Sequence, residues 1–274
     1  MKARTFLIAI LVSGLLASCI DMTEELFLTK KGSGKYTITM DLSGIMDMAN
    51  LAEMFGEENA PGEMSEPSDE TAPKEDREEG FGGLFGEGEG EDMTMDTLIN
   101  FYDDIKADQK QNLSNPEILK KGFMQIKMNE AEKVALMSFI VEFDKLSDIN
   151  EFFNVLAETN SEEEKESLGG LGSMIGMSNG FGDKDLFSLS KRVLTRTGTP
   201  EQYSELLNGE DGEFAKMMFK GAKYTTIYHL PGRVKNTTIP NAVVKGKTIT
   251  IENDFLDIIE EKVALDGQVK FKRR

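Results

Sequence analysis

This chain of 274 residues contains one cysteine, one histidine and no tryptophan. With Cys19 alone, no intramolecular disulfide and no CxxC metal knuckle can form, so the stability of the fold must come from packing. The single histidine, His229, excludes metal sites built from several histidines. It stands two residues before Pro231, at the end of an expected strand, which favours a structural polar residue over a general base. The lack of tryptophan argues mildly against an enzyme that stacks sugars.

The apolar run at the N-terminus is too short for a transmembrane helix. It covers the eleven residues from Phe6 to Leu16 and is interrupted only by Ser13 and Gly14, whereas a membrane-spanning helix needs about twenty residues. Lys2 and Arg4 precede the run, and the first charged residues after it, Asp21, Glu24 and Glu25, are acidic. A basic start followed by a short apolar region is typical of a secretory signal.

This run ends in Leu16-Ala17-Ser18-Cys19, which resembles the lipobox of bacterial lipoproteins. The resemblance implies cleavage between Ser18 and Cys19, transfer of a diacylglyceryl group to the Cys19 thiol, and acylation of the new amino terminus. Two or more acyl chains anchor a protein stably, at about 0.8 kcal/mol per buried methylene. Residue 20 is Ile rather than Asp, which in lipoproteins favours the outer membrane, on its periplasmic or surface side. The alternative is ordinary signal cleavage, with Cys19 left as a free thiol.

Acidic residues outnumber basic ones, and the net charge is −18. Two thirds of this excess lies in residues 57–92, where 14 acidic residues accompany only Lys74 and Arg77. The segment has three prolines and seven glycines, and too little apolar surface to offset the entropy of ordering it. We expect it to be disordered, and its charge disfavours nucleic acid and anionic lipid as partners of this segment. No D-x-[DN]-x-[DN]-G loop supports an EF-hand calcium site.

A second low-complexity stretch covers residues 161–183. It begins with the acidic run Glu162–Glu164 and continues with a glycine-rich segment, Gly169–Gly176. Glycines at this density prevent a stable helix, so we expect a mobile loop that partly folds back on the domain. Its glycines do not form a G-x-x-x-x-G-K-[ST] motif, which argues against a phosphate cradle.

Alternation of polar and apolar residues and helical spacing predict the ordered elements. The first two strands are joined by a hairpin loop at Lys31–Gly34 and follow Cys19 within a few residues, so the domain is expected to lie close to the membrane. The expected strands are 24–30, 35–41, 122–129, 135–143, 185–195, 223–230, 242–245, 247–252 and 268–272. The expected helices are 45–55, 95–105 with a stop at Pro116, 147–158, 199–208, 214–220 and 255–260.

These elements predict an α+β fold, with an antiparallel or mixed β-sheet and helices packed on one face. We divide the chain into a signal peptide at 1–18, the start of the α+β domain at 19–56, a disordered acidic insertion at 57–92, and the remainder of the same domain at 93–274, with the flexible loop 161–183. A hydrophobic fraction of 39 % is enough for a real core.

Three C-terminal segments, His229–Val234, Asn241-Ala242 and Gly246–Ile251, are similar to the end of an LppM-type lipoprotein domain. In that family a strand ends in Pro-Gly, an Asn-containing turn follows, and the next strand reads Gly-x-Thr-Val-Thr-Trp. Ile251 stands here in place of the tryptophan. The resemblance implies a membrane-tethered, non-enzymatic α+β domain that binds lipid or envelope components, and it supplies no catalytic residues.

The residues assign no catalytic, cofactor-binding or metal-binding site, and ligand-binding residues stay unknown. Carboxylate pairs such as Asp103-Asp104 and Glu260-Glu261 are expected on the solvated surface, and the sixteen methionines, including Met217-Met218, are expected to fill the core. The favoured function is a lipid-anchored envelope lipoprotein that acts as a non-enzymatic binding or assembly module for lipid, an envelope component or a protein. Two alternatives stay open: a structural surface protein whose acidic segment supplies hydration or weak cation binding, and a carboxylate-dependent hydrolase.

Overall fold

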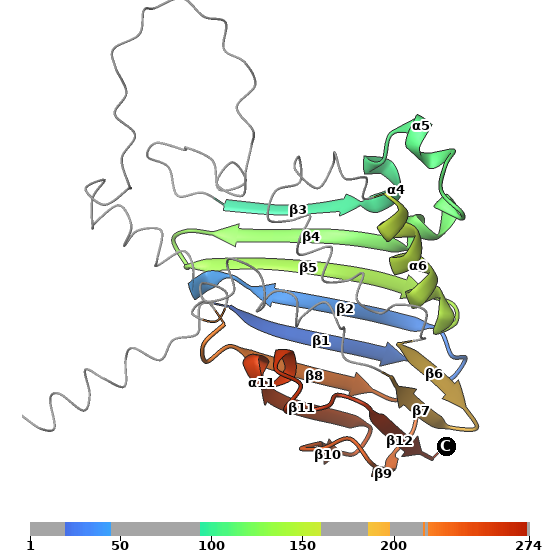
Figure 1. Cartoon of the computed structure of the whole chain (residues 1–274), viewed down its shortest axis with the longest axis vertical. Helices are drawn as coiled ribbons and strands as arrows, with labels where there is room; N and C mark the ends of the chain where they lie inside the picture. The colour runs from blue at the N-terminus through green and yellow to red at the C-terminus, as the bar shows by residue number, and fades with distance from the viewer. Residues whose placement is uncertain (1–19, 45–93, 160–185, 198–215, 217–218, 273–274) are drawn as a thin grey trace, which may run out of the picture.

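Two strands with alternating side chains form the centre of the fold. The computed structural model describes residues 20–44, 94–159, 186–197, 216 and 219–272 (Figure 1). Strands β1 (Asp21–Leu28) and β2 (Gly34–Asp41) form an antiparallel hairpin in which Leu26 pairs with Tyr36. Alternate residues along both strands are buried, as the sequence alternation predicts. The predicted hairpin is therefore confirmed.

The hairpin lies in an eight-stranded sheet, which we call sheet A. Its strand order is β10-β11-β8-β1-β2-β5-β4-β3. The β1–β8 pair is parallel and the other pairs are antiparallel, so the sheet is mixed. The remaining strands are β3 (Thr94–Asn100), β4 (Gly122–Asn129), β5 (Val134–Phe143), β8 (Lys223–His229), β10 (Val243–Lys245) and β11 (Thr248–Asp254).

A four-stranded sheet, which we call sheet B, is not predicted by the sequence. It has the order β6-β7-β12-β9 and contains β6 (Phe187–Ser190), β7 (Val193–Arg196), β9 (Val234–Thr237) and β12 (Gly267–Phe271). The single strand predicted over 185–195 is wrong, because the chain reverses between β6 and β7. Lys191 and Arg192 make this turn with φ angles of 45° and 74°. Such turns usually contain Asn-Gly, so Lys-Arg carries no turn signal.

Two helices form where apolar spacing predicts them. Helix α6 (Ser147–Glu158) buries Phe152 and Phe153, and helix α11 (Phe255–Ile259) buries Phe255. The Asp254 carboxylate caps α11 by accepting a hydrogen bond from the backbone N–H of Leu256 at 3.0 Å. Three shorter pieces are α4 (Phe101–Asp104), α5 (Ala107–Lys110) and the 3-10 helix η2 (Pro116–Lys121).

The helix predicted over 95–105 is wrong in its first half. Residues 94–100 form β3, which pairs with β4 at the edge of sheet A. Helical structure begins only at α4, where the Asn100 side chain accepts a hydrogen bond from the Tyr102 backbone N–H. The apolar spacing fits a helix, but pairing with β4 outweighs this local signal. Pro116 begins η2 instead of ending a helix, because a first-turn position needs no N–H.

The core lies on one face of sheet A. Tyr36 of β2 contacts Phe153 of α6 with ring centroids 6.2 Å apart and Phe187 of β6 at 5.6 Å, both edge to face. Tyr224 of β8 stacks on Phe255 of α11 at 5.9 Å. Sheet B and both helices therefore cover the same face, and Figure 1 shows α6 lying across β4 and β5. On the opposite face the side chains of sheet A are partly or fully exposed. The predicted α+β fold, with a mixed sheet and helices on one face, is confirmed.

Some predicted segments lie outside the described residues. They are the signal peptide at 1–18, the helix at 45–55, the acidic insertion at 57–92, the loop at 161–183 and the helix at 199–208. Within the helix predicted over 214–220, Lys216 is helical. Met217 and Met218 lie outside the described residues. Gly221, which is predicted to end that helix, has a φ of 81°, a conformation typical of a helix C-terminus.

Candidate functional site

The predicted anchor residues, Ser18 and Cys19, lie outside the described residues, which begin at Ile20. Ile20 is buried, and β1 starts at the next residue, Asp21. A lipid on Cys19 would therefore be attached within two residues of sheet A, at the end of the sheet where β1 starts. In the part of the chain that the structure describes, no helix combines the length and the apolar character needed to cross a membrane.

A cavity of about 340 Å³ lies near the opposite end of β1. It is bounded by the β1–β2 turn, the connection between β5 and α6, and strand β6. Its lining combines apolar side chains with exposed lysines and serines: Lys31, Gly32, Asp144, Lys145, Leu146, Ser147, Phe187, Ser188 and Leu189. A hollow with this lining fits a ligand that joins an anionic group to an apolar part.

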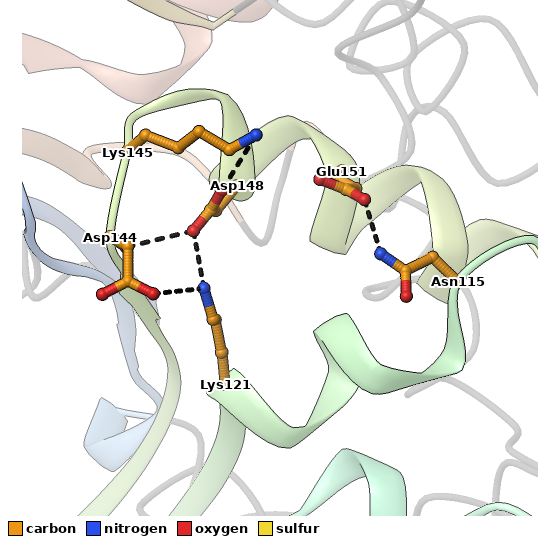
Figure 2. Close-up of polar contacts among 6 residues, drawn as sticks. All are labelled: Asn115, Lys121, Asp144, Lys145, Asp148 and Glu151. Atoms are coloured by element: carbon orange, nitrogen blue, oxygen red, sulfur yellow. Dashed lines mark hydrogen bonds and ion pairs between the residues drawn. The ribbon is translucent and has the colours of Figure 1, made fainter.

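Charged side chains hold the connection between β5 and α6, whose residues 144–147 line the cavity, and Figure 2 shows their contacts. Lys121 Nζ, at the end of η2, lies 2.9 Å from Asp144 Oδ2 and 2.7 Å from Asp148 Oδ2. Asp148 Oδ2 also accepts a hydrogen bond from the Asp144 backbone N–H at 3.0 Å, and its Oδ1 lies 3.8 Å from Lys145 Nζ. The Asp148 side chain is only 3 % exposed. The connection between β5 and α6 is thus held to η2 by a buried carboxylate.

Both partners of this contact stay charged at neutral pH. Burial raises the pKa of Asp148, but the hydrogen bonds from Lys121 and the Asp144 backbone outweigh it and hold this pKa below its usual range. Burial likewise lowers the pKa of Lys121, and the two carboxylates more than reverse that effect, so its pKa is raised. Removing one partner of such a pair would leave the other charge buried without compensation, which strongly destabilises a fold.

Two further contacts hold α6 against the segment before η2. Asn115 Nδ2 donates to Glu151 Oε1 at 2.6 Å, which Figure 2 also shows. The Ser114 hydroxyl donates to Glu158 Oε1 at 2.6 Å. With the Lys121 contacts, these bonds hold α6 from its first turn to its last residue, and Ser147 at its start lines the cavity.

A second charged cluster lies in the core between the two sheets. Arg196 of β7 donates to Glu24 of β1 through Nη2, 2.7 Å from Oε2, and through Nε, 3.3 Å from Oε1. Their side chains are 1 % and 0 % exposed. The Tyr224 hydroxyl donates to Glu24 Oε2 at 2.6 Å. Burial lowers the pKa of Arg196, but the negative charge of Glu24 more than reverses this, so the pKa lies well above its usual value.

Two hydroxyl groups near this pair lack partners. Tyr228 Oη and Thr226 Oγ1 are buried and make no hydrogen bond with any described residue. Burial and then the charge of Glu24 raise the pKa of Tyr228 well above its ordinary value, so it stays neutral. The cluster therefore joins sheet B to sheet A through compensated charges.

His229 lies at the end of β8, the strand end that the sequence predicts, on the open face of sheet A. Its Nε2 lies 2.7 Å from Glu25 Oε1, and its Nδ1 lies 3.5 Å from Thr248 Oγ1. The imidazole stacks on Phe27 with ring centroids 4.1 Å apart. These contacts fit a satisfied polar residue. Among the described residues, no group of three His, Cys, Asp or Glu side chains is arranged to hold a metal ion.

No known protein family, curated protein or solved structure matches this chain. The resemblances to a lipobox and to an LppM-type domain therefore stay predictions, and the site must be interpreted from its own residues.

A short serine motif was missed in the sequence. Gly176–Gly180 reads Gly-Met-Ser-Asn-Gly, which matches the letters of the nucleophile elbow, G-x-S-x-G. This segment lies outside the described residues and within the glycine-rich stretch, without the apolar strand pattern that should precede an elbow. The motif therefore assigns no active site.

The sequence predicts neither charged cluster, although one signal for the second, Glu24–Arg196, was present. In β1, the alternation that buries Met22 and Leu26 also places Glu24 on the core face, so this carboxylate needs a partner. The partner, Arg196, stands 172 residues later, and only the tertiary structure brings it there. The Asp103-Asp104 and Glu260-Glu261 pairs are exposed, as predicted.

Proposed function

We propose that this protein is a lipid-anchored envelope lipoprotein of the outer membrane that acts as a non-enzymatic binding or assembly module. The lipobox-like stretch at Leu16–Cys19 supports the anchor, together with the start of β1 only two residues after Cys19. The cavity beside the β1–β2 turn is the observation that carries the binding role. Its partner is a lipid, an envelope component or a protein.

The lining of the cavity indicates the chemistry of its ligand. Phe187 and Leu146 are buried, and Leu189 is 40 % exposed, so an apolar part of a ligand can contact all three. Lys31 and Lys145 are exposed beside them and can bind a carboxylate or phosphate group. The ligand we propose is therefore a small amphiphile with one anionic group.

A carboxylate-dependent hydrolase has less support. Glycoside hydrolysis needs two carboxyl groups that face each other across about 5–9.5 Å. The buried carboxylates Glu24 and Asp148 each bind a cation, and neither lines the cavity. The lining contains Asp144, whose carboxylate is bound by Lys121.

Mass spectrometry of the mature N-terminus tests the anchor. We expect a chain that begins at a diacylglyceryl-modified, acylated Cys19. An unmodified Cys19 would overturn the proposed localisation and leave the cavity to be tested separately.

Native mass spectrometry of the detergent-extracted full chain tests the cavity. We expect an amphiphile to co-purify, and Leu189→Asp to abolish its retention, because a carboxylate at the cavity repels an anionic ligand. Leu98→Asp is the matched control, since Leu98 is 59 % exposed at the edge strand β3, away from the cavity. The binding role is wrong if both variants retain the amphiphile equally, or if none co-purifies.

A further inference from the structure

Three segments of this acidic chain contain no acidic residue. Residues 187–197, 223–250 and 267–274 carry three, five and four Lys or Arg residues respectively and no Asp or Glu, whereas the chain as a whole has 49 acidic residues. The segments are far apart in the sequence. Their common charge matters only if the fold brings them together.

Backbone hydrogen bonds join these segments at one corner of the molecule. The Val234 N–H donates to the Gly246 carbonyl in the β10–β11 turn at 2.9 Å. At the end of β12, the Lys272 N–H donates to the Arg233 carbonyl at 2.8 Å, and the preceding N–H donates to the Arg192 carbonyl at 3.1 Å. The β6–β7 turn, the β10–β11 turn and the C-terminal end of β12 therefore lie side by side.

The β1–β2 turn belongs to the same end of the molecule. Strands β1 and β8 run parallel, Phe27 pairs with His229, and the arrowheads of β1, β8 and β12 point the same way in Figure 1. We call the exposed cations here the basic end: Lys30, Lys31, Lys191, Arg192, Arg233, Lys245, Lys247 and Lys272. None of these eight residues forms an ion pair with another described residue.

Exposed apolar side chains accompany these cations. Among the described residues, five large apolar side chains are exposed, and four of them stand within three residues of a basic-end cation. These four are Phe27, Leu189, Val243 and Val244, with exposures of 37 %, 40 %, 56 % and 42 %. The fifth, Leu98, lies on β3 at the far edge of sheet A. Cations beside exposed apolar groups are the pattern of interfacial membrane binding.

The β6–β7 turn keeps two cations in an unfavourable conformation. Lys191 and Arg192 both have positive φ angles, a geometry that Asn-Gly adopts without this strain. A partner that binds the Lys191 and Arg192 side chains would explain why these residues occupy a turn that they fit poorly.

We propose that the basic end docks on an anionic phospholipid surface. Its lysines and arginines bind the headgroups, and the apolar side chains beside them enter the interfacial region. A soluble polyanion would use the cations but gain nothing from the apolar side chains. Because the chain as a whole is strongly acidic, an anionic surface repels its other faces and orients the basic end toward the membrane. The inference rests on the proposed function, since it names a lipid surface as the partner.

The docking surface is separate from the proposed anchor. Cys19 precedes β1, which starts at Asp21, whereas the basic end lies where β1 finishes, at Leu28. At about 3.3 Å per residue, the seven steps along the strand place its two ends about 23 Å apart. The protein would therefore contact membrane at two places, at opposite ends of sheet A.

Vesicle co-sedimentation tests the proposal with the full chain carrying Cys19→Ala, which has no thiol to lipidate. The probes are vesicles of phosphatidylcholine alone and vesicles with equal parts of phosphatidylserine. We expect preferential binding to the anionic vesicles, and we expect the preference to fall as salt is added. Equal binding to both compositions would overturn the proposal.

The first variant combines Lys191→Asn, Arg192→Gly, Lys245→Gln and Lys247→Gln. Asn-Gly fits the β6–β7 turn, so this variant keeps the fold, which circular dichroism checks. Each cation near an anionic surface contributes about fivefold to binding. We expect a loss of at least about a hundredfold on anionic vesicles.

The matched control changes four exposed lysines outside the basic end, Lys106, Lys127, Lys133 and Lys262, to Gln. It alters the net charge by the same amount, and we expect it to leave vesicle binding almost unchanged. An equal loss in both variants would mean a response to net charge alone and would overturn the proposal.

A second variant tests the apolar part of the surface. Val243→Thr with Val244→Thr keeps β-branched residues in β10 and should weaken binding to anionic vesicles about tenfold. Binding to long-chain polyphosphate without binding to anionic vesicles would identify a soluble polyanion and contradict the proposal. Because all these proteins lack the Cys19 thiol, failure here leaves the anchor to be judged by mass spectrometry of the natural chain.

Discussion

At the residue scale, a few charged side chains decide how the layers are joined. Glu24 and Arg196 neutralise each other in the core, where either charge alone would be strongly unfavourable. Asp148 does the same for Lys121 at the start of α6. Each buried carboxylate needs a cation at one particular place. These pairs therefore fix the relative position of two elements more narrowly than apolar contacts do.

Arg196→Met is expected to lower the free energy of unfolding by about 3–5 kcal/mol, because it leaves Glu24 buried without a counter-charge. Urea denaturation followed by circular dichroism measures this. The double variant Glu24→Met with Arg196→Met should recover most of the loss. If the single and double variants are equally unstable, Arg196 does not stabilise the protein by compensating the charge of Glu24.

Asp148→Asn is expected to remove part of the dependence of stability on pH. The pKa of Asp148 is lowered in the folded protein, so its contribution is present above the unfolded value of about 4 and is lost as the pH falls through the folded pKa. At pH 7 the variant should be less stable by about 1–3 kcal/mol, and the difference should shrink near pH 3.

Urea midpoints at both pH values measure the effect of Asp148→Asn. Asp104→Asn, an exposed carboxylate on α4, is the control and should match the parent at both. A loss for Asp148→Asn that is equally large at pH 3 would contradict the role of its charge.

At the element scale, close packing between α6 and sheet A fixes the helix. Gly122 begins β4 under the ring of Phe152, and a Cβ at this position would lie 2.0 Å from Phe152 Cε2. Glycine is therefore required here by the approach of a side chain, since only its small size leaves room for the ring. Ser147, the first residue of the same helix, lines the cavity. The contact between Gly122 and Phe152 therefore links the core to the proposed binding site.

Gly122→Ala is expected to destabilise the protein by about 1–3 kcal/mol, because the ring must move. In a Phe152→Leu background the same substitution should have a smaller effect, and a double-mutant cycle of unfolding free energies measures the difference. Additive effects of the two substitutions would show that Gly122 is needed for another reason.

At the scale of the whole molecule, charge is distributed unevenly. The basic end gathers cations of three acid-free segments, while residues 57–92 carry a net charge of −12 out of −18. Strand β3 begins two residues after this acidic segment, at the edge of sheet A farthest from β10. Strands β3 and β1 point the same way in Figure 1, so β3 begins at the end of sheet A opposite the basic end.

Deletion of residues 57–92 is expected to change the net charge from −18 to −6 and to leave the unfolding midpoint within about 3 °C of the parent. A tract with so little apolar surface adds little to the core. Differential scanning calorimetry measures the midpoint. Loss of a surface phenotype with an unchanged midpoint would favour the alternative of a hydrating surface protein, and an unchanged phenotype would rule that alternative out.

Elements with strong local patterns could be predicted from neighbouring residues alone. Helix α6 and strand β4 have the predicted bounds, and the hairpins β1–β2 and β10–β11 form where they are predicted. These elements follow from periods of two and 3.6 residues and from turns with glycine, which are properties of neighbouring residues.

Only the tertiary structure decided the rest. Strand β3 contradicts its helical spacing because β4 offers an edge to pair with, and sheet B depends on a Lys-Arg turn that has no local signal. The Glu24–Arg196 pair, the cavity and the basic end each combine residues from distant segments. Burial of a shared core sets which of these segments meet, and that is a property of the whole chain rather than of any window along it.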